Sequence, residues 1–200
     1  YPLRRQRQMC IRDSNKGETF WDRFVVRVAP AENNLPYREA SRINIHRDTW
    51  GTNLYQQINW WAPVSNVEEK NTMIFYPDYF DVPVKNTTST WDLNIYLANR
   101  KKGDFSYPSA PQLKEDLPSN IKKIPVTIKP GEILCFSGAH LHSSSKEKSE
   151  NTRISFEIRT ICENDLNSSA QAPNVDCDLQ WKFPKIFKKI NDNSPLKITS

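Results

Sequence analysis

Polar and apolar side chains alternate along the stretch Thr152-Arg153-Ile154-Ser155-Phe156-Glu157-Ile158-Arg159-Thr160. Successive side chains of a β-strand point to opposite faces of a sheet, so this alternation predicts a strand. Arg153, Ser155, Glu157 and Arg159 share one of its faces, and Ile154, Phe156 and Ile158 share the other. We expect this strand to be one of several that pair into a sheet.

Other strand-like runs recur along the chain, each with β-branched or aromatic residues. They occupy residues 24–28, 53–61, 72–76, 124–128 and 132–136. The last two flank Lys129-Pro130-Gly131, where proline presets φ and glycine supplies a positive φ, as in a tight turn. Short strands joined by turns predict an all-β fold with a few short helices, built as an antiparallel sandwich or barrel.

The remaining segments are expected to be less regular. We interpret residues 100–120 as a long surface loop, with 104–117 as a candidate lid over a substrate, and expect a short helix within 181–190. Residues 1–14 show neither a strand nor a helix period, and they resemble a translated sequencing-adapter remnant. We therefore expect a non-native tail at 1–14, one domain at 15–178 and a C-terminal extension at 179–200.

Composition argues against several classes of function. The net charge of +5 is scattered, and no central segment combines a basic face with interleaved aromatic residues, so we expect no nucleic-acid partner. A run of about 18 apolar residues and a secretion signal are both absent from the sequence, so we expect a cytoplasmic protein with no membrane contact. The four cysteines form no C-x-x-C pair, which argues against a zinc ribbon or a thioredoxin-like site. No feature of the sequence indicates the oligomeric state.

The chain has only three histidines, and they lie in two short segments, His46-Arg47-Asp48 and His140-Leu141-His142. Residues two apart in a strand share a face, so His46 and Asp48 can direct an imidazole and a carboxylate to one point. A histidine of the second segment would complete the 2-His-1-carboxylate triad of non-haem Fe(II) oxygenases. The alternative for a lone H-x-D is a surface or core histidine with no metal.

Arg153 strengthens the metal interpretation. It lies eleven residues after His142 and begins the alternating strand, so it can point into the same cavity as the metal. Its planar guanidinium suits a two-point grip on a carboxylate, and the hydroxyl of Ser155 on the same face can add a hydrogen bond. The alternative for Arg153, taken alone, is an ordinary surface arginine.

Several motifs together carry a family resemblance. They are His46-Arg47-Asp48-Thr49-Trp50-Gly51, Asn59-Trp60-Trp61-Ala62-Pro63, residues 130–137, Ala139-His140-Leu141-His142, residues 152–160 and Ala172-Pro173-Asn174-Val175-Asp176. Over about residues 40–178 the chain resembles the phytanoyl-CoA dioxygenase-like superfamily of Fe(II)/2-oxoglutarate oxygenases. The resemblance implies a double-stranded β-helix (a cupin-like jelly roll), with Fe(II) as the metal and 2-oxoglutarate as co-substrate.

The resemblance also implies roles for single residues. His46, Asp48 and His142 match the iron ligands, and Arg153 matches the arginine that binds 2-oxoglutarate. Trp61 falls near a position that flanks the co-substrate, with plain core packing as its alternative. Apart from the resemblance, Trp50 lies next to the H-x-D motif and could stack on a sugar or ring of the substrate, with core packing as its alternative, and His140 is a candidate contact with the substrate or with a metal ligand. His140 remains the rival distal ligand, and His142 is preferred because its interval to Arg153 fits the superfamily.

The expected function is hydroxylation of a small molecule, such as a sugar or a natural-product intermediate, with release of succinate and CO2. One alternative is a cupin-like metal-binding isomerase or binding protein that uses no 2-oxoglutarate. Arg153 separates the two readings, because without a co-substrate it should face solvent. Another alternative is a truncated, inactive domain, since members of the superfamily carry more chain before the H-x-D motif.

Overall fold

The structure is a computed structural model that describes residues 17–31, 43–104, 106–145, 147, 149–168 and 170–198. The tail expected at 1–14 lies outside the described residues. Most of the regular structure is antiparallel β-sheet, with a few short helices, as the sequence predicts. No helix in the described ranges has both the length and the apolar character needed to cross a bilayer.

The larger sheet is built around the longest strand, β8, which pairs antiparallel with β1, β2 and β3. The order along the sheet is β6-β3-β8-β1-β9, and β2 also pairs with β8. Its strands are β1 (Thr19–Trp21), β2 (Val25–Ala29), β3 (Ile58–Pro63), β6 (Leu134–Ser137), β8 (Arg153–Cys162) and β9 (Lys188–Lys189).

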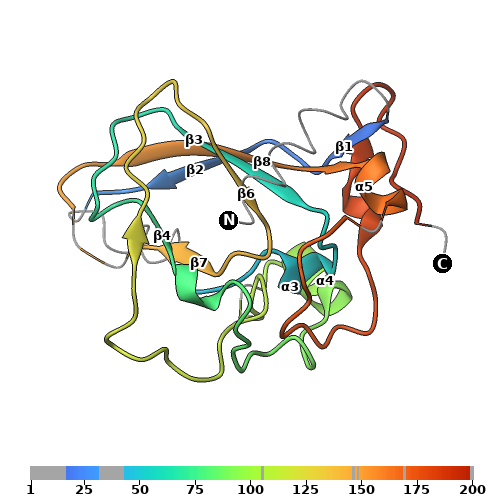
Figure 1. Cartoon of the computed structure of the whole chain (residues 1–200), viewed down its shortest axis with the longest axis horizontal. Coiled ribbons are helices and arrows are strands. Elements are labelled where there is room, and N and C mark those ends of the chain that lie inside the picture. The colour runs from blue at the N-terminus through green and yellow to red at the C-terminus, as the bar shows by residue number, and fades with distance from the viewer. Residues whose placement is uncertain are drawn as a thin grey trace.

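The smaller sheet has the order β5-β4-β7 and lies opposite β3 and β8 in Figure 1. Its strands are β4 (Met73–Phe75), β5 (Ile124–Pro125) and β7 (His142–Ser144). An apolar cluster of Trp61, Met73, Val126 and Phe136 contains side chains from both sheets. Burial of such side chains is the main force that holds two sheets face to face.

The alternation along β8 is confirmed, and its polar face is the inner one. The side chains of Arg153 and Ser155 are 3% and 0% exposed, whereas that of Ile154 between them is 37% exposed. The interior of this sheet therefore carries charged groups, which is unusual because burying a charge is costly unless the charge is paired. The inner face of β8 is for this reason the first place to look for a functional site.

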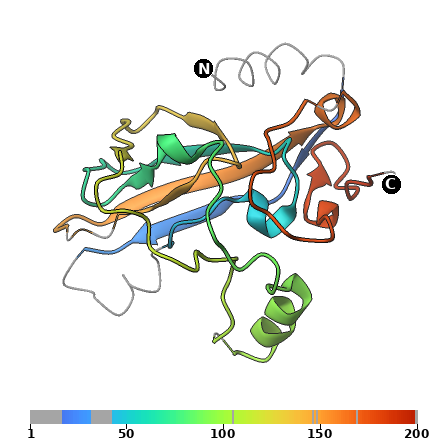
Figure 2. The ribbon, with the colours of Figure 1, turned by 60° about the horizontal axis from the view of Figure 1, so that its bottom comes forward.

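Several elements differ from the sequence prediction. β3 begins at Ile58 rather than 53, because Asn53 adopts a left-handed conformation (φ 54°) at the C-terminus of helix α3 (Thr49–Thr52). Helix α4 (Leu93–Lys101), which stands away from the sheets in Figure 2, was not predicted. Its first turn is capped by the Asp92 side chain, which accepts hydrogen bonds from the amides of Asn94 and Ile95.

The C-terminal part of the chain is irregular but packed. It contains α5 (Glu163–Asn167), the 3-10 helix η3 (Pro184–Ile186) and β9, while the 3-10 helix η2 (Pro77–Tyr79) follows β4. Phe187 is fully buried in a cluster with Phe20, Leu54, Ile161 and Leu196. The turn expected at 129–131 is present, with Gly131 at φ 94° and a hydrogen bond from the Glu132 amide to the Lys129 carbonyl.

Candidate metal centre

His46 and His142 lie directly opposite each other across an isolated antiparallel bridge. The His46 amide donates to the His142 carbonyl at 2.9 Å, and the His142 amide donates to the His46 carbonyl at 3.0 Å. Residues paired in this way project their side chains to the same side, and the two imidazole centroids are 4.3 Å apart. Backbone pairing thus brings together two histidines that are far apart in the sequence.

The other ring nitrogens fix the orientation of both imidazoles. His46 Nδ1 lies 2.8 Å from the Asn44 carbonyl oxygen, and His142 Nδ1 lies 2.9 Å from the His140 carbonyl oxygen. A carbonyl only accepts, so each Nδ1 carries the proton and each Nε2 presents a lone pair. Metal-binding histidines are commonly oriented by such a contact, because it sets the tautomer and the angle of the ring.

Asp48 completes the cluster. Its Oδ1 is 3.7 Å from His46 Nε2, and its Oδ2 is 3.6 Å from His142 Nε2. Ligand atoms of these three residues all lie within 4.8 Å of one another. The sequence placed Asp48 in an extended strand, but it stands at the turn into α3, with φ −64° and ψ −30°. The convergence is as expected, although a turn produces it.

The pocket between the three side chains has a volume of about 20 Å3, which is room for one ion. Two imidazole nitrogens and a carboxylate are donors that suit a divalent transition metal. Both imidazoles carry their proton on Nδ1, so the Nε2 lone pairs are free to bind such an ion. Apolar and aromatic side chains close the pocket on other sides, among them Met73 and Phe136. The residues present therefore fit a mononuclear metal centre.

Burial and nearby charges keep Asp48 and His142 in the deprotonated forms that bind a metal. Burial alone would raise the pKa of Asp48, but His46, His142 and the guanidinium of Arg159 lower it below its ordinary range. Burial lowers the pKa of His142 to about 4, aided by repulsion from His46. At neutral pH Asp48 is an anion and the His142 imidazole is neutral, which are the forms that bind a metal.

The lowered histidine pKa values predict that the metal-free protein loses stability in weak acid. Burial also lowers the pKa of His140 to about 4. The unfolded chain therefore binds more protons than the folded chain between about pH 6.5 and pH 4, and the free energy of unfolding should fall across that window. Each histidine contributes at most about 1.4 kcal/mol per pH unit.

Urea unfolding of the metal-free protein at several pH values between 7.5 and 4.5 measures this effect. In the variant His140→Phe, one of the two titrating groups is gone and the aromatic packing is kept, so the slope should become shallower. A free energy of unfolding that is unchanged between pH 7 and pH 5 in the parent protein would contradict the burial of neutral imidazoles.

Arg153 is buried at the end of β8 and forms no ion pair with a carboxylate among the described residues, although the charge of Glu157 acts on it and raises its pKa. Its Nε and the Oγ of Ser155 are both buried without a hydrogen-bond partner in that part of the chain. The guanidinium carbon lies 5.8 Å from the ring centroid of Trp61, which also lines the metal pocket. Burial lowers the pKa of Arg153 to about 10, and Arg27 lowers it further, yet the group stays charged at neutral pH.

Orphaned buried donors are rare because leaving them unpaired is costly. Arg153 Nε and Ser155 Oγ are therefore donors that suit an anionic co-substrate at this end of β8, although neither residue lines the metal pocket itself. Arg153, Ser155 and Trp61 lie on one face of the larger sheet, because Trp61 pairs with Glu157 and residues 153, 155 and 157 share a face of β8. Their contact with a co-substrate stays a prediction.

Four further charged residues of the interior were not predicted as site residues from the sequence. Arg159 lies 3.7 Å from Asp48 through its Nη1 and donates to Asp22 at 2.6 Å, and Arg27 pairs with Glu157 at 2.5 Å. The alternation of β8 carried a signal for two of them, because Glu157 and Arg159 share the parity of Arg153. The positions of Asp22 and Arg27 depend on the pairing of β1 and β2 with β8, which the sequence does not show.

Two expected site residues lie elsewhere. The ring of His140 packs against Phe80, with centroids 4.5 Å apart, and it lines neither the metal pocket nor the cavity beside it. Trp50 is fully buried in the core, and its Nε1 donates to Asp176 at 2.7 Å. Both side chains are packed against other residues, and their expected contacts with a substrate stay predictions.

Arg47, between the two expected ligands, does not line the candidate metal pocket and instead anchors the segment to neighbouring loops. Its Nε donates to Asp176 at 3.1 Å, while its terminal nitrogens donate to the carbonyls of Ala139 and Tyr79, each at 2.6 Å. Both members of the ion pair are buried, with side chains 2% and 4% exposed. Arg47 thus links the metal-bearing turn to the loop before His142.

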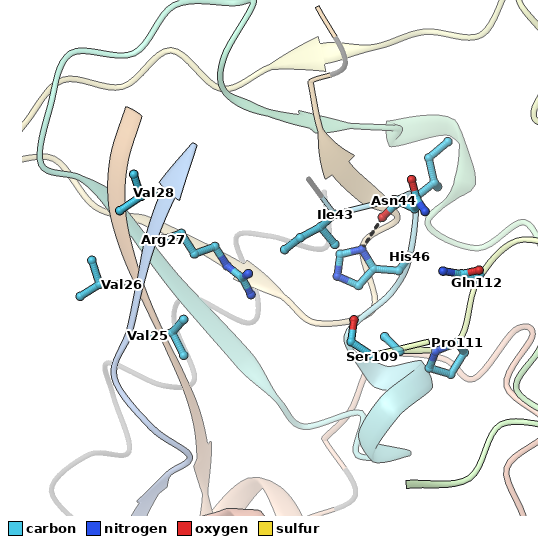
Figure 3. A pocket seen from close by; sticks show the side chains of 12 residues that line it. Val25, Val26, Arg27, Val28, Ile43, Asn44, His46, Ser109, Pro111 and Gln112 are labelled. Atoms are coloured by element: carbon cyan, nitrogen blue, oxygen red, sulfur yellow. Dashed lines mark hydrogen bonds between the residues drawn. The ribbon is translucent and has the colours of Figure 1, made fainter. Parts of the chain in front are cut away.

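A larger cavity of about 320 Å3 adjoins the metal pocket. Arg27, Ile43 and His46 line both spaces, and in Figure 3 the side chains of Arg27 and His46 point toward the space between β2 and residues 43–46. Residues 109–112 form another wall, so part of the expected 104–117 lid does border this cavity. Its volume is in the range of small-molecule sites.

Comparison with known proteins gives structural similarity without sequence similarity. No protein-family model matches the sequence, and neither does any curated protein sequence. Solved structures of several non-haem enzymes do match. The chain is similar to the non-heme monooxygenase ThoJ, with 14% identity and a TM-score of 0.48 over 73% of this chain and 47% of ThoJ.

It is also similar to EvdO2 from Micromonospora carbonacea var. aurantiaca in complex with 2-oxoglutarate, with 10% identity and a TM-score of 0.49 over 72% of this chain and 52% of that one. A third match is the epimerase SnoN in complex with Fe3+, alpha ketoglutarate and nogalamycin RO, with 13% identity and a TM-score of 0.47, over 72% and 50% of the two chains. The chain spans about half the length of these proteins. At this level of similarity, its activity has to be decided by its own side chains.

Proposed function

We propose that this chain is an Fe(II)/2-oxoglutarate-dependent oxygenase that acts on a small molecule, with hydroxylation as the reaction. One observation carries the proposal. The two buried histidines His46 and His142 and the half-buried Asp48 form a cluster between the two sheets, and the inner face of β8 also carries Arg153, a buried guanidinium without an ion pair in the described chain. The two facing sheets support a double-stranded β-helix as the scaffold.

The donor set supports Fe(II) as the metal. Two imidazoles and one carboxylate are the donor set typical of non-haem Fe(II) oxygenases, and these three side chains would hold such an ion while leaving it accessible to a co-substrate and O2. His46 and His142 supply Nε2 lone pairs, and Asp48 supplies a charge that neighbouring groups hold ionised. Bound iron supplies oxidation of a substrate C–H bond by O2, coupled to conversion of 2-oxoglutarate to succinate and CO2.

Arg153 supports the co-substrate. Its guanidinium and the Ser155 hydroxyl offer donors suited to the remote carboxylate of 2-oxoglutarate, and the indole of Trp61 flanks them. A cupin-like protein that binds only a metal would have no use for a buried, unpaired arginine, and the expectation for that alternative was an arginine facing solvent. The 3% exposure of Arg153 favours the oxygenase.

The cavity beside His46 is the proposed substrate site. Residues from β2, from 43–46 and from 109–112 surround it, and they present both apolar side chains and neutral hydrogen-bonding groups such as Asn44 and Gln112. Because His46 lines the cavity and the metal pocket together, a molecule bound there lies next to the metal centre. The side chains of Met73, Trp61 and Phe136 keep water from the other side.

Succinate formation tests the proposal without a known substrate, because oxygenases of this kind turn over slowly in an uncoupled reaction. The protein is incubated with Fe(II), ascorbate, O2 and 2-oxoglutarate, and succinate is measured against a sample with chelator. Succinate that depends on Fe(II) is the expected result. Absence of succinate, together with no heat of 2-oxoglutarate binding to the Mn(II)-loaded protein, would leave the metal-only alternative.

A further inference from the structure

The carboxylate of Asp48 is contacted by two nitrogen groups that donate hydrogen bonds and offer no lone pair to a metal. The Asn59 Nδ2 donates to Oδ2 in a short hydrogen bond, and Arg159 Nη1 lies 3.7 Å from Oδ1. Asn59 and Arg159 are directly opposite each other in the pairing of β3 with β8, so both reach Asp48 from the same place in the sheet. Each oxygen of the carboxylate thus has an outer partner, meaning a residue that contacts the candidate ligand but is not itself one of the three candidate ligands.

Asn59 is itself held by a buried chain of side chains. Gln57 Nε2 donates to Asn59 Oδ1 at 2.9 Å, and Thr52 Oγ1 donates to Gln57 Oε1 at 3.2 Å. An ionised carboxylate only accepts hydrogen bonds, so the Asn59 amino group must face Asp48. That choice turns the Asn59 oxygen toward Gln57, which in turn fixes the Gln57 amide and makes Thr52 the donor. The ionised carboxylate of Asp48 therefore determines which group donates and which accepts in each hydrogen bond from Asn59 through Gln57 to Thr52.

Gly138 has no side chain, and the side chains of Gln57 and Asn59 occupy the space beside it. A Cβ at that position would lie 2.7 Å from Gln57 Nε2 and 3.5 Å from Asn59 Oδ1. The first distance is too short for real atoms, so any side chain there would displace the Gln57 amide. The Gly138 amide also donates to the Gln57 carbonyl at 3.1 Å, which joins the chain to the loop that precedes His142.

We propose that Asn59, oriented by Gln57, is a positioning residue that holds the Asp48 carboxylate for the metal. The inference rests on the proposed metal centre and adds residues outside the three expected ligands. A ligand carboxylate that lacks such an outer partner rotates freely and must be ordered when the metal binds. Loss of an outer partner typically weakens metal binding about 10- to 100-fold.

The test compares metal binding in the parent protein, Asn59→Ala, Gln57→Ala and the double variant. Mn(II) affinity is measured by calorimetry, and the visible absorption spectrum of the Co(II)-loaded protein reports the geometry at the metal. Asn59→Ala should bind Mn(II) about 10- to 100-fold more weakly and show a changed Co(II) spectrum. Gln57→Ala should have a smaller effect, and in the double variant it should add nothing, because it acts through Asn59.

Asn71→Ala provides the matched control. Asn71 is buried to a similar degree as Asn59 (7% against 5% exposed), and it donates to Ser149 Oγ and the Asn151 carbonyl, outside the metal pocket. Its loss should lower the melting temperature but leave the Mn(II) affinity and the Co(II) spectrum unchanged. A purely structural role for Asn59 would give this same pattern.

Three results would overturn the inference. The first is an Asn59→Ala protein with the parent's Mn(II) affinity and Co(II) spectrum. If Asn59→Ala does not fold, Gln57→Ala decides, and a parent-like affinity and spectrum there is the second. The third is a parent protein that binds no Mn(II) or Co(II), which would remove the metal centre itself and not only its positioning.

Discussion

Replacing His142 by alanine should abolish Fe(II)-dependent conversion of 2-oxoglutarate to succinate. His142 is one of three groups whose ligand atoms lie within 4.8 Å of one another, and a backbone bridge to His46 holds it there. Loss of an outer partner of a metal ligand already costs about 10- to 100-fold, so loss of the ligand itself should exceed about 100-fold. The measurement is succinate formed per protein at saturating Fe(II) and 2-oxoglutarate.

His140→Ala is the matched control, because the two histidines are two residues apart. The ring of His140 packs against Phe80 and Phe75, outside the metal pocket. Its removal should reduce the free energy of unfolding by roughly 0.5–3 kcal/mol, as for other partly buried side chains, and leave succinate formation within a few-fold of the parent. The reverse pattern, with activity lost in His140→Ala and kept in His142→Ala, would make His140 the distal ligand.

Replacing Arg153 by leucine should have two large effects of opposite sign. Binding of 2-oxoglutarate to the Mn(II)-loaded protein should weaken by about 2–5 kcal/mol, or roughly 30- to 5000-fold, because a buried charge-assisted contact is lost. The metal-free protein should be as stable as the parent or more stable by up to about 4 kcal/mol, because a buried charge that has no ion pair in the described part of the chain is replaced by an apolar side chain. Calorimetry and urea unfolding measure the two quantities.

Arg159→Leu tests whether this gain is specific to an unpaired arginine. Arg159 lies on the same face of β8 but pairs with Asp22 and Asp48. Its replacement leaves two carboxylates without their cation and should destabilise the protein by about 3–5 kcal/mol. If Arg153→Leu destabilises the metal-free protein as strongly as Arg159→Leu, Arg153 has a partner in the folded chain and the basis for a co-substrate site at β8 disappears.

The sequence predicted the strands that alternate and missed the elements that do not. β8 and β2 could be found because period-two alternation and β-branched runs are strong signals of strands. α4 has no buried residue, so no apolar period marks it, and only Asp92 before Leu93 hinted at a helix start. The segment after α3 was read as strand because its apolar residues alternate, although Asn53 turns the backbone into a left-handed conformation.

For the site, the sequence predicted the three candidate metal ligands but not the residues that hold them in place. Histidine and aspartate in an H-x-D motif, a distal histidine and an arginine are rare enough together to be picked out by eye. Asn59 and Arg159 support Asp48 only because β3 and β8 pair in one register, which places them opposite each other. Register depends on the packing of the whole sheet, and residue types along one strand do not reveal it. Trp50 shows the converse, since an aromatic residue next to the ligands proved to be core.

The length of β8 has a consequence for how such a protein can change its chemistry. Arg153 and Arg159 stand six residues apart on one face of a single strand, a separation of roughly 20 Å at 3.3 Å per residue. Inserting or deleting one residue between them would turn one guanidinium outward, so this separation cannot be adjusted gradually. New substrate preferences are therefore expected to arise by variation in segments outside β8, such as 43–46 and 109–112, while the spacing of the two arginines along β8 stays fixed.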